Sequence, residues 1–452
     1  MDTWLDDAKM LGFQVPRVSP LQTLDKKPLS APVVIVGAGP SGLAVAAALN
    51  RRKISNIVLE SQEDPTQFGS WDQHFSNLEV TSQAKWCQLP NFPIHKCEEW
   101  KGEYITAQEY RHYLHLYAAR FGIEILRGVQ VVSIEKGHDP QKSWTLETRP
   151  SLCIRTKASV TSSETTTRLS ASAVIVAIGK HRVPFRNTSD NLVERLEHAK
   201  IPSCHTADLR DDSTWNQAIQ AARTGRLAIV GFGNSAADIA TAILRQCPQN
   251  PGAKNTFTPR VHIAARTVPP VFPRQKSVFR VDTIGWFVRL LTYIQIGSWW
   301  SLEDFIVKLL WWVLPSSRTC NLAFPPHLPR WVRIQGRVPV IDKYGILASG
   351  FASGQLVGHG PVLQVLHGDG ASSLSFDDGN QCCIPVPIEM VILATGYRTI
   401  DVSSGIATRH EDRLNGLYHC GLGNDRFLPL HSIGEEALGI AHKIASGFRP
   451  TS

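Results

Sequence analysis

Two glycine-rich turns carry the residues whose chemistry is clearest in this chain of 452 residues. The first turn, Gly37-Ala38-Gly39-Pro40-Ser41-Gly42, follows four β-branched residues and precedes a stretch rich in Ala and Leu. In a strand–turn–helix unit of this kind, Gly37 allows the tight turn, Gly39 lets the backbone approach a pyrophosphate, and Gly42 lets the helix pack closely on the strand. The helix would offer free N–H groups and the positive end of its dipole to the phosphates. The pattern predicts a dinucleotide site rather than an ordinary turn between a strand and a helix.

An acidic residue follows at the distance that such a site requires. The next apolar run, Ile57-Val58-Leu59, predicts a second strand, and it ends in Glu60. In dinucleotide sites, a carboxylate roughly 20 residues beyond the first glycine accepts hydrogen bonds from the ribose hydroxyls. Strand, glycines, helix, strand and acid therefore occur in the expected order.

A second turn of the same type occurs in the middle of the chain. Gly231-Phe232-Gly233-Asn234-Ser235-Ala236 follows the apolar run Leu227–Val230, and the dinucleotide pattern allows Ala at its third glycine position. The next predicted strand, Val261–Ala265, ends in Arg266. A guanidinium can pair bidentately with a 2′-phosphate, so this site is predicted to prefer NADP. The alternative is that Arg266 is only an exposed charge at the end of a strand.

Two turns with different residues at the strand ends predict two different dinucleotides, and FAD with NADPH is the simplest pair. A duplicated domain with one inactive site is the alternative, and the intact glycines in both turns argue against it. The predicted fold class is α/β, with two Rossmann-like dinucleotide-binding domains and the second inserted in the first. We expect an irregular leader over 1–30, an FAD-binding domain formed by 31–182 and 397–452, and an NADPH-binding domain over 183–396.

Composition narrows the remaining possibilities. The formal net charge is +8, but Lys and Arg are spread along the chain, so nucleic acid is not a predicted partner. The nine cysteines include no CxxC pair and no spacing typical of a metal site, which indicates reduced thiols in an intracellular protein, and we expect a cytoplasmic location and no metal. The first residues, Met1–Asp7, contain no signal-peptide pattern.

Periodicity and capping residues predict the other elements. Thr106 and Glu109 form a capping-box pattern at the start of a predicted helix over 107–121. Other expected elements are a helix over 43–50, strands at 123–125, 129–134 and 173–179, a Ser/Thr-rich hairpin loop at 157–170, and a last helix over 433–446.

Residues 277–314 are apolar and contain five Trp residues, but charged residues interrupt the run. We interpret this segment as amphipathic helices that form a wall of a substrate channel, and a membrane-surface face is the less favoured alternative.

The chain resembles the class B flavin-containing monooxygenases, and most closely their YUCCA-type branch, from about Val33 to Ala445. The resemblance rests on both glycine-rich turns and on four further motifs: Gly69-Ser70-Trp71, Cys87-Gln88-Leu89-Pro90-Asn91-Phe92-Pro93, Phe272-Pro273-Arg274 and Leu393-Ala394-Thr395-Gly396-Tyr397-Arg398. It implies that reduced FAD reacts with O2 to form a C4a-(hydro)peroxyflavin, which transfers one oxygen atom to a small organic substrate. An apolar or aromatic substrate such as an indole is expected.

The resemblance also implies a set of site residues. Thr81, Ser82 and Gln83 are expected to face the flavin ring from a loop and to hydrogen-bond its N5 and O4 atoms. The expected cofactor-binding residues are Gly37, Gly39, Pro40, Ser41, Gly42, Glu60, Ser61, Gly69, Trp71, Val131, Gly179, His205, Gly231, Gly233, Asn234, Ser235, Ala236, Arg266, Arg274, Ala394, Thr395, Gly396 and Gly421.

The sequence departs from the family at its histidine fingerprint, FxGxxxHxxx(Y/F). Only His205 matches, because Ala199, Ile201 and Leu209 stand at the Phe, Gly and final aromatic positions. His205 is either a site residue that positions NADP or a structural loop histidine. Two alternatives to oxygen transfer of the expected kind stay open: an NADPH-dependent flavin oxidase or reductase, and a membrane-docked flavoprotein without activity. A Baeyer–Villiger enzyme is a related alternative, but the Trp-Pro that should follow the histidine is absent.

Overall fold

The computed structural model describes residues 18–19, 33–65, 67–72, 74, 78–94, 102–139, 142–151, 166–179, 183–186, 190–247, 260–274, 315–328, 340–367, 372–379, 385–398, 416–421 and 429–447. These residues form two compact units. The first unit contains Met1–Asp72, Gln83–Val183 and Arg398–Ser452, and the second contains Gln73–Ser82 and Pro184–Tyr397. The Trp-rich segment 277–314 lies outside the described residues, as do the expected loop residues 157–165.

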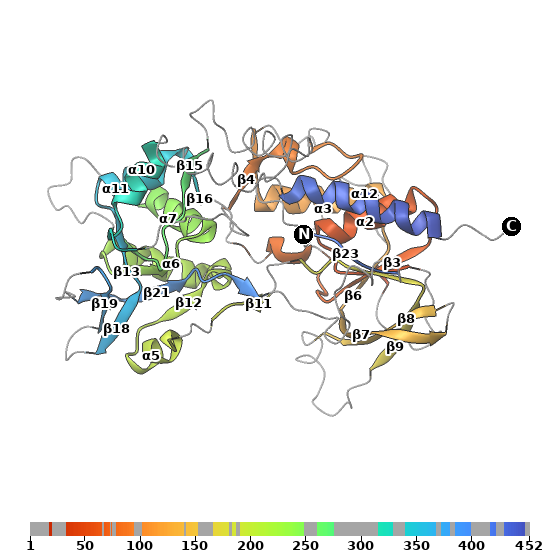
Figure 1. The fold of residues 1–452 in the computed structure, drawn as a ribbon, viewed down its shortest axis with the longest axis horizontal. Coiled ribbons are helices and arrows are strands. Elements are labelled where there is room, and N and C mark those ends of the chain that lie inside the picture. Colours follow the sequence, from red (N-terminus) through yellow and green to blue (C-terminus); the bar gives the residue numbers. More distant parts are fainter. Residues whose placement is uncertain are drawn as a thin grey trace. The chain divides into compact units, whose positions relative to one another are not determined.

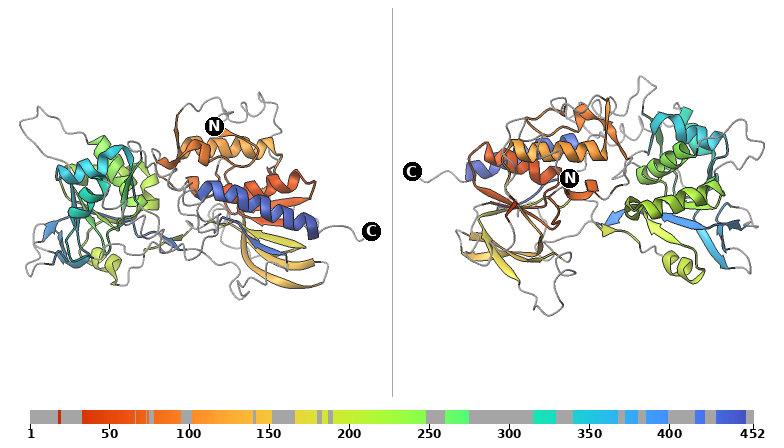
Figure 2. Two further views of the ribbon diagram at one scale, coloured as in Figure 1. Left: turned by 45° about the horizontal axis from the view of Figure 1, so that its top comes forward. Right: turned by 180° about the vertical axis from the view of Figure 1, so that it is seen from behind.

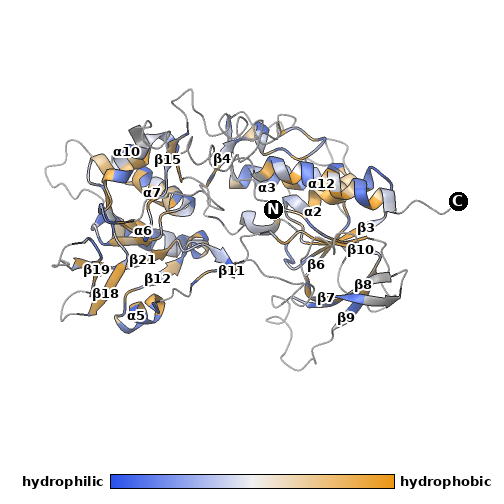
Figure 3. Ribbon diagram, viewed as in Figure 1, coloured by the Kyte–Doolittle hydropathy of each residue, from blue (hydrophilic) through white to orange (hydrophobic). Residues whose placement is uncertain are grey.

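A parallel sheet forms the centre of the first unit. Its strand order is β1 (Val18–Ser19), β6 (Ile125–Arg127), β3 (Asn56–Glu60), β2 (Val33–Val36), β10 (Ala173–Val176) and β23 (Leu417–His419). Strand β1 corrects the expectation of an entirely irregular leader, because Val18 and Ser19 pair with β6. Strand β10 is hydrophobic along its length, as expected for a strand covered on both faces (Figure 3).

Helices cover one face of this sheet, and a small antiparallel sheet covers the other (Figures 1 and 2). The helices are α2 (Pro40–Asn50), α3 (Ala107–Arg120) and α12 (Pro429–Gly447), and the antiparallel strands are β7 (Val129–Asp139), β8 (Lys142–Pro150) and β9 (Thr167–Ala171). The remaining elements are the 3-10 helices η2 (Gly69–Asp72) and η3 (Ala84–Trp86), the strand β5 (Tyr104–Thr106), and β4 (Glu79–Gln83), in which the chain crosses between the units.

Two local expectations in the first unit have clear outcomes. The capping box is confirmed, because Thr106 Oγ1 accepts from the Glu109 N–H at 3.1 Å and the Glu109 carboxylate accepts from the Thr106 N–H at 2.7 Å. The expectation of a loop over 157–170 is wrong at its end, since Thr167–Ala171 forms β9 and pairs with β8. Leu169 and Ala171 are buried on one side of β9, and this alternation stabilises a strand even in a Ser/Thr-rich sequence.

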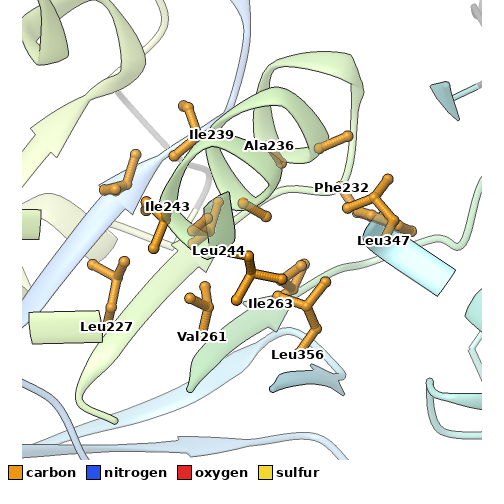
Figure 4. Close-up of a cluster of buried hydrophobic side chains, with 14 of the residues drawn as sticks. Leu227, Phe232, Ala236, Ile239, Ile243, Leu244, Val261, Ile263, Leu347 and Leu356 are labelled. Carbon is orange, nitrogen blue, oxygen red and sulfur yellow. The ribbon is translucent and has the colours of Figure 1, made fainter. Parts of the chain in front are cut away.

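The second unit repeats the same three-layer plan. Its parallel sheet has the order β12 (Ser203–His205), β21 (Met390–Leu393), β13 (Leu227–Val230), β14 (Val261–Ala264) and β17 (Leu356–His359). Helices α6 (Asp212–Arg223) and α7 (Asn234–Gln246) lie on one face, where Leu227, Ile263 and Leu356 meet Ile239 and Ile243 (Figure 4).

The opposite face of the second sheet packs against α5 (Leu192–His198) and the antiparallel strands β18 (Val362–His367), β19 (Ser372–Phe376) and β20 (Val386–Pro387). Other elements of this unit are β15 (Val271–Pro273), β16 (Val340–Asp342), α10 (Pro315–Leu322), α11 (Ile346–Ala352), η5 (Thr206–Arg210) and η6 (Lys343–Gly345). The short strands β11 (Val183–Pro184) and β22 (Tyr397–Arg398) lie where the chain crosses between the units.

The second unit is therefore inserted in the first, as the predicted α/β fold class requires. One segment differs from the expected domain limits, because residues 73–82 belong to the second unit instead of the first. The reason is a pairing between distant segments of the chain: Glu79 forms an ion pair with Arg274 and a hydrogen bond with Tyr344.

Candidate dinucleotide sites and their surroundings

The first glycine-rich turn is built so that its glycines are required. Gly37 follows β2 with φ +104°, and an added Cβ would lie 2.7 Å from the carbonyl oxygen of Ala177. Its N–H donates to the Leu59 carbonyl at 2.8 Å, which fixes the turn between β2 and β3. A Cβ on Gly42 would lie 1.9 Å from the Gly37 oxygen, so α2 packs against the turn too closely for any side chain there. Gly37 and Gly42 therefore serve the two packing functions predicted for them.

The N-terminus of α2 is available to an anion. Gly39 is the N-cap residue, no side chain caps the helix, and its first turn contains no acidic residue. Within the described part of the chain, the nearest non-neighbouring atom to an added Gly39 Cβ is the Cα of Gly69, at 4.0 Å. The absence of a side chain at Gly39 thus leaves space beside free backbone N–H groups, and this cradle fits the pyrophosphate of FAD.

Glu60 is held against this turn. Its carboxylate is buried at the end of β3, where Oε2 accepts from the Ala38 N–H at 2.8 Å and Oε1 accepts from the Gln62 N–H at 3.0 Å. The Ser61 hydroxyl donates to Oε1 at 3.1 Å. Because each carboxylate oxygen can accept two hydrogen bonds, the group keeps acceptor capacity for a ribose hydroxyl.

Other predicted FAD residues surround the same turn. Gly421 lies beside Ser41, since an added Cβ on Gly421 would be 2.1 Å from the Ser41 hydroxyl. Gly179 has φ +70° and open space where a Cβ would be. The side chain of Val131 is buried in the core between the sheet and β7–β9, so a contact with the cofactor would come from its backbone.

Three tyrosines that sequence analysis missed hold the Cys87–Phe92 loop. Tyr110, Tyr113 and Tyr117 are buried on one face of α3. Each hydroxyl donates to a backbone carbonyl of the loop: Tyr110 to Cys87 at 3.1 Å, Tyr113 to Phe92 at 2.7 Å and Tyr117 to Pro90 at 3.0 Å. Burial raises the pKa of Tyr110 and of Tyr117, which keeps both hydroxyls protonated as donors.

This tyrosine face also contacts the Gly69-Ser70-Trp71 motif, because the rings of Trp71 and Tyr110 meet edge to face with centroids 4.5 Å apart. The sequence signal that could have predicted this face is the spacing of the three tyrosines within the helix predicted over 107–121, since residues three and four apart share a helix face.

The second turn has nearly the same geometry as the first. Gly231 has φ +109°, its N–H donates to the Ala264 carbonyl at 2.8 Å, and an added Cβ would lie 2.4 Å from the Ala394 oxygen. Gly233 is the N-cap of α7, again without a side-chain cap or an acidic residue in the first turn, and nothing lies within 4 Å of an added Cβ. The cradle fits the pyrophosphate of NADPH in the same way. Ala236 is buried, while Asn234 Oδ1 accepts from the Ile341 N–H at 3.0 Å.

The two predicted arginines of this unit have different environments. Arg266 is exposed just beyond β14, where its guanidinium is accessible to a ligand. Arg274 is 2% exposed and its guanidinium binds the Glu79 carboxylate at 2.7 Å. The expected role of Arg274 in cofactor binding stays a prediction, and its guanidinium already has a partner within the second unit.

His205 bridges two backbone segments. Its Nε2 lies 2.9 Å from the Gly396 carbonyl oxygen, and Nδ1 accepts from the Ala207 N–H at 3.2 Å. Burial lowers the pKa of His205, and the hydrogen bond to Gly396 opposes this in part. Both ring nitrogens thus have protein partners, which favours the structural alternative, in which His205 fixes the Thr395-Gly396 turn.

The three candidate catalytic residues lie on strand β4 rather than on a loop, which corrects that expectation. Thr81 and Ser82 are half-buried, whereas Gln83 is buried and its amide donates to the Glu103 carboxylate. The strand fixes alternate side-chain directions, so Thr81 and Gln83 share one side of β4 and Ser82 lies on the other.

Comparisons with known proteins agree with this geometry. The family model described as pyridine nucleotide-disulphide oxidoreductase matches residues 34–250. The chain is 25% identical over 369 residues to the probable indole-3-pyruvate monooxygenase YUCCA4 of Arabidopsis thaliana, covering 81% of this chain and 75% of the relative. It is 26% identical over 378 residues to the indole-3-pyruvate monooxygenase YUCCA8 of Oryza sativa subsp. indica, covering 81% and 76%. These matches agree with the resemblance to the class B flavin-containing monooxygenases and their YUCCA-like branch.

Solved structures share the fold of the chain. The flavin-containing monooxygenase of Stenotrophomonas maltophilia has a TM-score of 0.59 at 15% identity, and the match covers 93% of this chain and 99% of that one. FAD and NADPH stay the cofactors predicted for this chain from its two glycine-rich turns. None of its described helices is long and apolar enough to cross a membrane.

Proposed function

We propose that this protein is a monooxygenase that uses FAD and NADPH to transfer one oxygen atom from O2 to a small apolar or aromatic organic substrate, and releases the other oxygen as water. The observation that carries the proposal is the pair of open, uncapped dinucleotide turns with opposite strand-end charges, Glu60 in one unit and Arg266 in the other. Bound FAD would accept a hydride from NADPH and would supply the reaction with oxygen, chemistry that amino-acid side chains lack.

The residues of the chain have defined tasks in this scheme. Gly39 and the N-terminus of α2 bind the FAD pyrophosphate, and Glu60 binds its ribose. Gly233 and the N-terminus of α7 bind the pyrophosphate of NADPH, and Arg266 selects its 2′-phosphate. Thr81 and Ser82 are the residues of β4 whose hydroxyls are accessible enough to hydrogen-bond the flavin ring, and Gln83 supports the strand through Glu103.

Indole-3-pyruvate is the first substrate to test, because it appears in the names of the relatives at 25–26% identity. Other aromatic 2-oxo acids and indoles form the second group. The partners we propose are therefore small molecules and O2, and a cytoplasmic location is supported by the reduced state of the five described cysteines, all of them buried.

The decisive experiment supplies FAD-loaded protein with NADPH, candidate substrate and oxygen-18 gas. We expect one labelled oxygen atom in the product and one NADPH consumed for each product formed. Rapid NADPH oxidation that yields only hydrogen peroxide with every substrate would support an oxidase instead. Failure of NADPH to reduce the flavin at all would contradict the proposal outright.

A matched variant links the result to the second site. Gly233→Val should keep FAD bound and abolish its reduction by NADPH, whereas dithionite should still reduce the flavin. This control separates loss of the nucleotide site from general damage to the protein.

A further inference from the structure

Two buried cations, Arg274 and Lys343, pair with two half-buried carboxylates close to the helix α7 that follows the second dinucleotide turn. Arg274 donates to Glu79 Oε1 at 2.7 Å, and the Tyr344 hydroxyl donates to Glu79 Oε2 at 2.6 Å. Lys343 Nζ lies 2.7 Å from Asp238 Oδ1 and also donates to the backbone carbonyl of Glu79. All five residues belong to the second unit, although Glu79 is separated from Arg274 by 195 residues in sequence.

The charges in this group balance, since Glu79 and Asp238 face Arg274 and Lys343. Burial alone would raise the pKa of Glu79, but hydrogen bonds from Arg274 and Tyr344 and the nearby positive charges outweigh it, and the pKa is lowered. Lys343 is 5% exposed in its side chain, so removing either of its partners would leave an uncompensated buried charge. The arrangement therefore specifies one position for Glu79.

The turn that presents Lys343 and Tyr344 is fixed by its own contacts. Tyr344 has φ +66°, a backbone conformation that residues other than Gly rarely adopt. The buried Asp342 carboxylate accepts from the N–H groups of Leu347 and Ala348 at 2.8 and 3.3 Å, which joins the turn to α11. Backbone strain of this kind persists only where surrounding contacts over-determine it.

The same turn is connected to the nucleotide-binding helix in two places. Asp238, the partner of Lys343, lies in α7 just beyond its first turn. Asn234, the first residue of α7, accepts from Ile341 in β16, two residues before Lys343. Two residues of α7 are thus bonded to the 341–344 segment that holds Glu79.

We propose that Arg274 and Lys343 are positioning residues that join the start of β4 to α7, so that a nucleotide bound at α7 restrains residues 79–82, which include the candidate flavin-contacting residues Thr81 and Ser82. The inference rests on the proposed function, because it takes the N-terminus of α7 to be the NADPH site. It assigns to the buried charges a coupling task in addition to stability. Coupling of this kind requires a physical element whose position both sites influence, and the 341–344 segment is that element.

The test measures hydrogen exchange in the peptide that covers residues 78–83, in the FAD-loaded full-length protein, with and without saturating NADP+. In the wild type, we expect NADP+ to slow exchange of this peptide at least threefold. In Lys343→Met, which keeps the aliphatic stem and removes the charge, the slowing should be lost while the Kd for NADP+ stays within threefold of wild type. Glu79→Gln provides a second variant if Lys343→Met folds poorly.

The matched control is Glu389→Gln, which breaks the exposed ion pair of Glu389 with Arg226 in the same unit. This variant should keep the wild-type response to NADP+. Kinetics supply a second readout, because a lost positioning contact should lower the rate of flavin reduction at saturating NADPH more than it raises the KM for NADPH.

The outcomes separate the inference from the function on which it rests. If wild-type protein binds NADP+ but the 78–83 peptide does not respond, or if Lys343→Met and Glu79→Gln both keep the response, the coupling is overturned and the proposed function stands. If wild-type protein does not bind NADP+, the proposed function fails and the inference fails with it.

Discussion

The two dinucleotide-binding units solve the same turn in the same way. In each, the first glycine donates to the strand beside it at 2.8 Å, Gly37 to Leu59 and Gly231 to Ala264. In each, the carbonyl of the residue after another strand closes over that glycine, so that an added Cβ would meet Ala177 or Ala394 at 2.7 or 2.4 Å. The backbone hydrogen bonds of these two alanines also match: Ala177 donates to Val36 in β2 at 2.8 Å, and Ala394 donates to Val230 in β13 at 2.9 Å.

The units differ at two positions near the expected place of the pyrophosphate: the third glycine position of the turn and the residue at the end of the next strand. The third glycine position holds Gly42 in the first unit and the buried Ala236 in the second, so only the first helix needs the closest approach to its turn. The strand-end residues differ more: Glu60 is buried and bonded to the turn, whereas Arg266 is exposed. We therefore expect the turn to recognise the pyrophosphate that all dinucleotides share, and the strand ends to recognise what distinguishes one dinucleotide from another.

The largest loss of stability is expected when the third glycine position of the first turn, Gly42, is made like that of the second turn, Ala236. Gly42→Ala would place a Cβ 1.9 Å from the Gly37 oxygen, and α2 would have to move. We expect a loss of about 4–5 kcal/mol of unfolding free energy and loss of FAD, as for other severe steric changes in a core. The reverse change, Ala236→Gly, should lower stability by only about 1 kcal/mol. Chemical denaturation of both variants measures the difference, and equal effects would show that the two helices pack alike.

The middle glycines separate ligand binding from folding. Both Gly39 and Gly233 have room for a side chain in the protein itself, so Gly39→Val and Gly233→Val should fold. We expect Gly39→Val to weaken FAD binding about a thousandfold, about 4 kcal/mol, because the valine would occupy the place of the pyrophosphate. Gly233→Val should weaken NADP+ binding similarly and leave FAD in place. A yellow, fully loaded Gly39→Val protein would count against the first site.

Local signals predicted the turns and the elements around them because these depend on residues close in sequence. The two glycine patterns, the capping box of Thr106 and Glu109, and the apolar strands are all of this kind. Arg274 could not be assigned from sequence, because its partner Glu79 lies in a distant segment and a buried arginine gives the same pattern as a phosphate-binding one. The same long-range pairing explains why residues 73–82 belong to the second unit.

His205 and the tyrosines of α3 illustrate a second limit. A histidine at a fingerprint position predicts a site, but the contacts to Gly396 and Ala207 show that its nitrogens hold the backbone. The tyrosines had a visible helical spacing, yet only the folded loop shows that each hydroxyl meets a carbonyl. The spacing of the tyrosines is visible in the sequence, but their hydrogen bonds to the loop are visible only in the structure.

Strands β14 and β3 match in position, but at their matching second pairing position only β14 has a titratable residue, and this gives a third prediction. His262 in β14 pairs in register with the second residue of β13, where Ile57 of β3 pairs with the second residue of β2. Burial lowers the pKa of His262 to about 4, and the neighbouring His359 adds to the shift. Because the unfolded pKa is about 6.5, the unfolded state binds the proton first, and stability present above pH 6.5 is lost as the pH falls toward 4.

We expect the wild type to lose about 3 kcal/mol more than His262→Gln between pH 7 and pH 4, from the difference between the two pKa values. Denaturation curves at pH 7, 5.5 and 4 check this. The variant removes the contact of His262 with His359 at every pH, so only the difference in pH dependence is informative. Parallel curves for the two proteins would exclude a role for His262.

The smallest expected effect tests the strand ends themselves. Arg266 is exposed, and within the described part of the chain it forms no ion pair, so its replacement should leave the fold and FAD binding unchanged. Loss of a charge-assisted pair with a 2′-phosphate is worth about 1.5–3 kcal/mol, which corresponds to a rise of about ten- to a hundredfold in KM for NADPH. NADH lacks that phosphate, so its KM should change little in Arg266→Ala.

The exposed residue Arg260 provides the matched control. Arg260 directly precedes β14, so Arg260→Ala removes an equal charge at the other end of the strand. If Arg266→Ala raises the KM for NADPH and the KM for NADH no differently from Arg260→Ala, the strand end in the second unit does not recognise the 2′-phosphate. The difference between Glu60 and Arg266 would then not be what distinguishes the two sites.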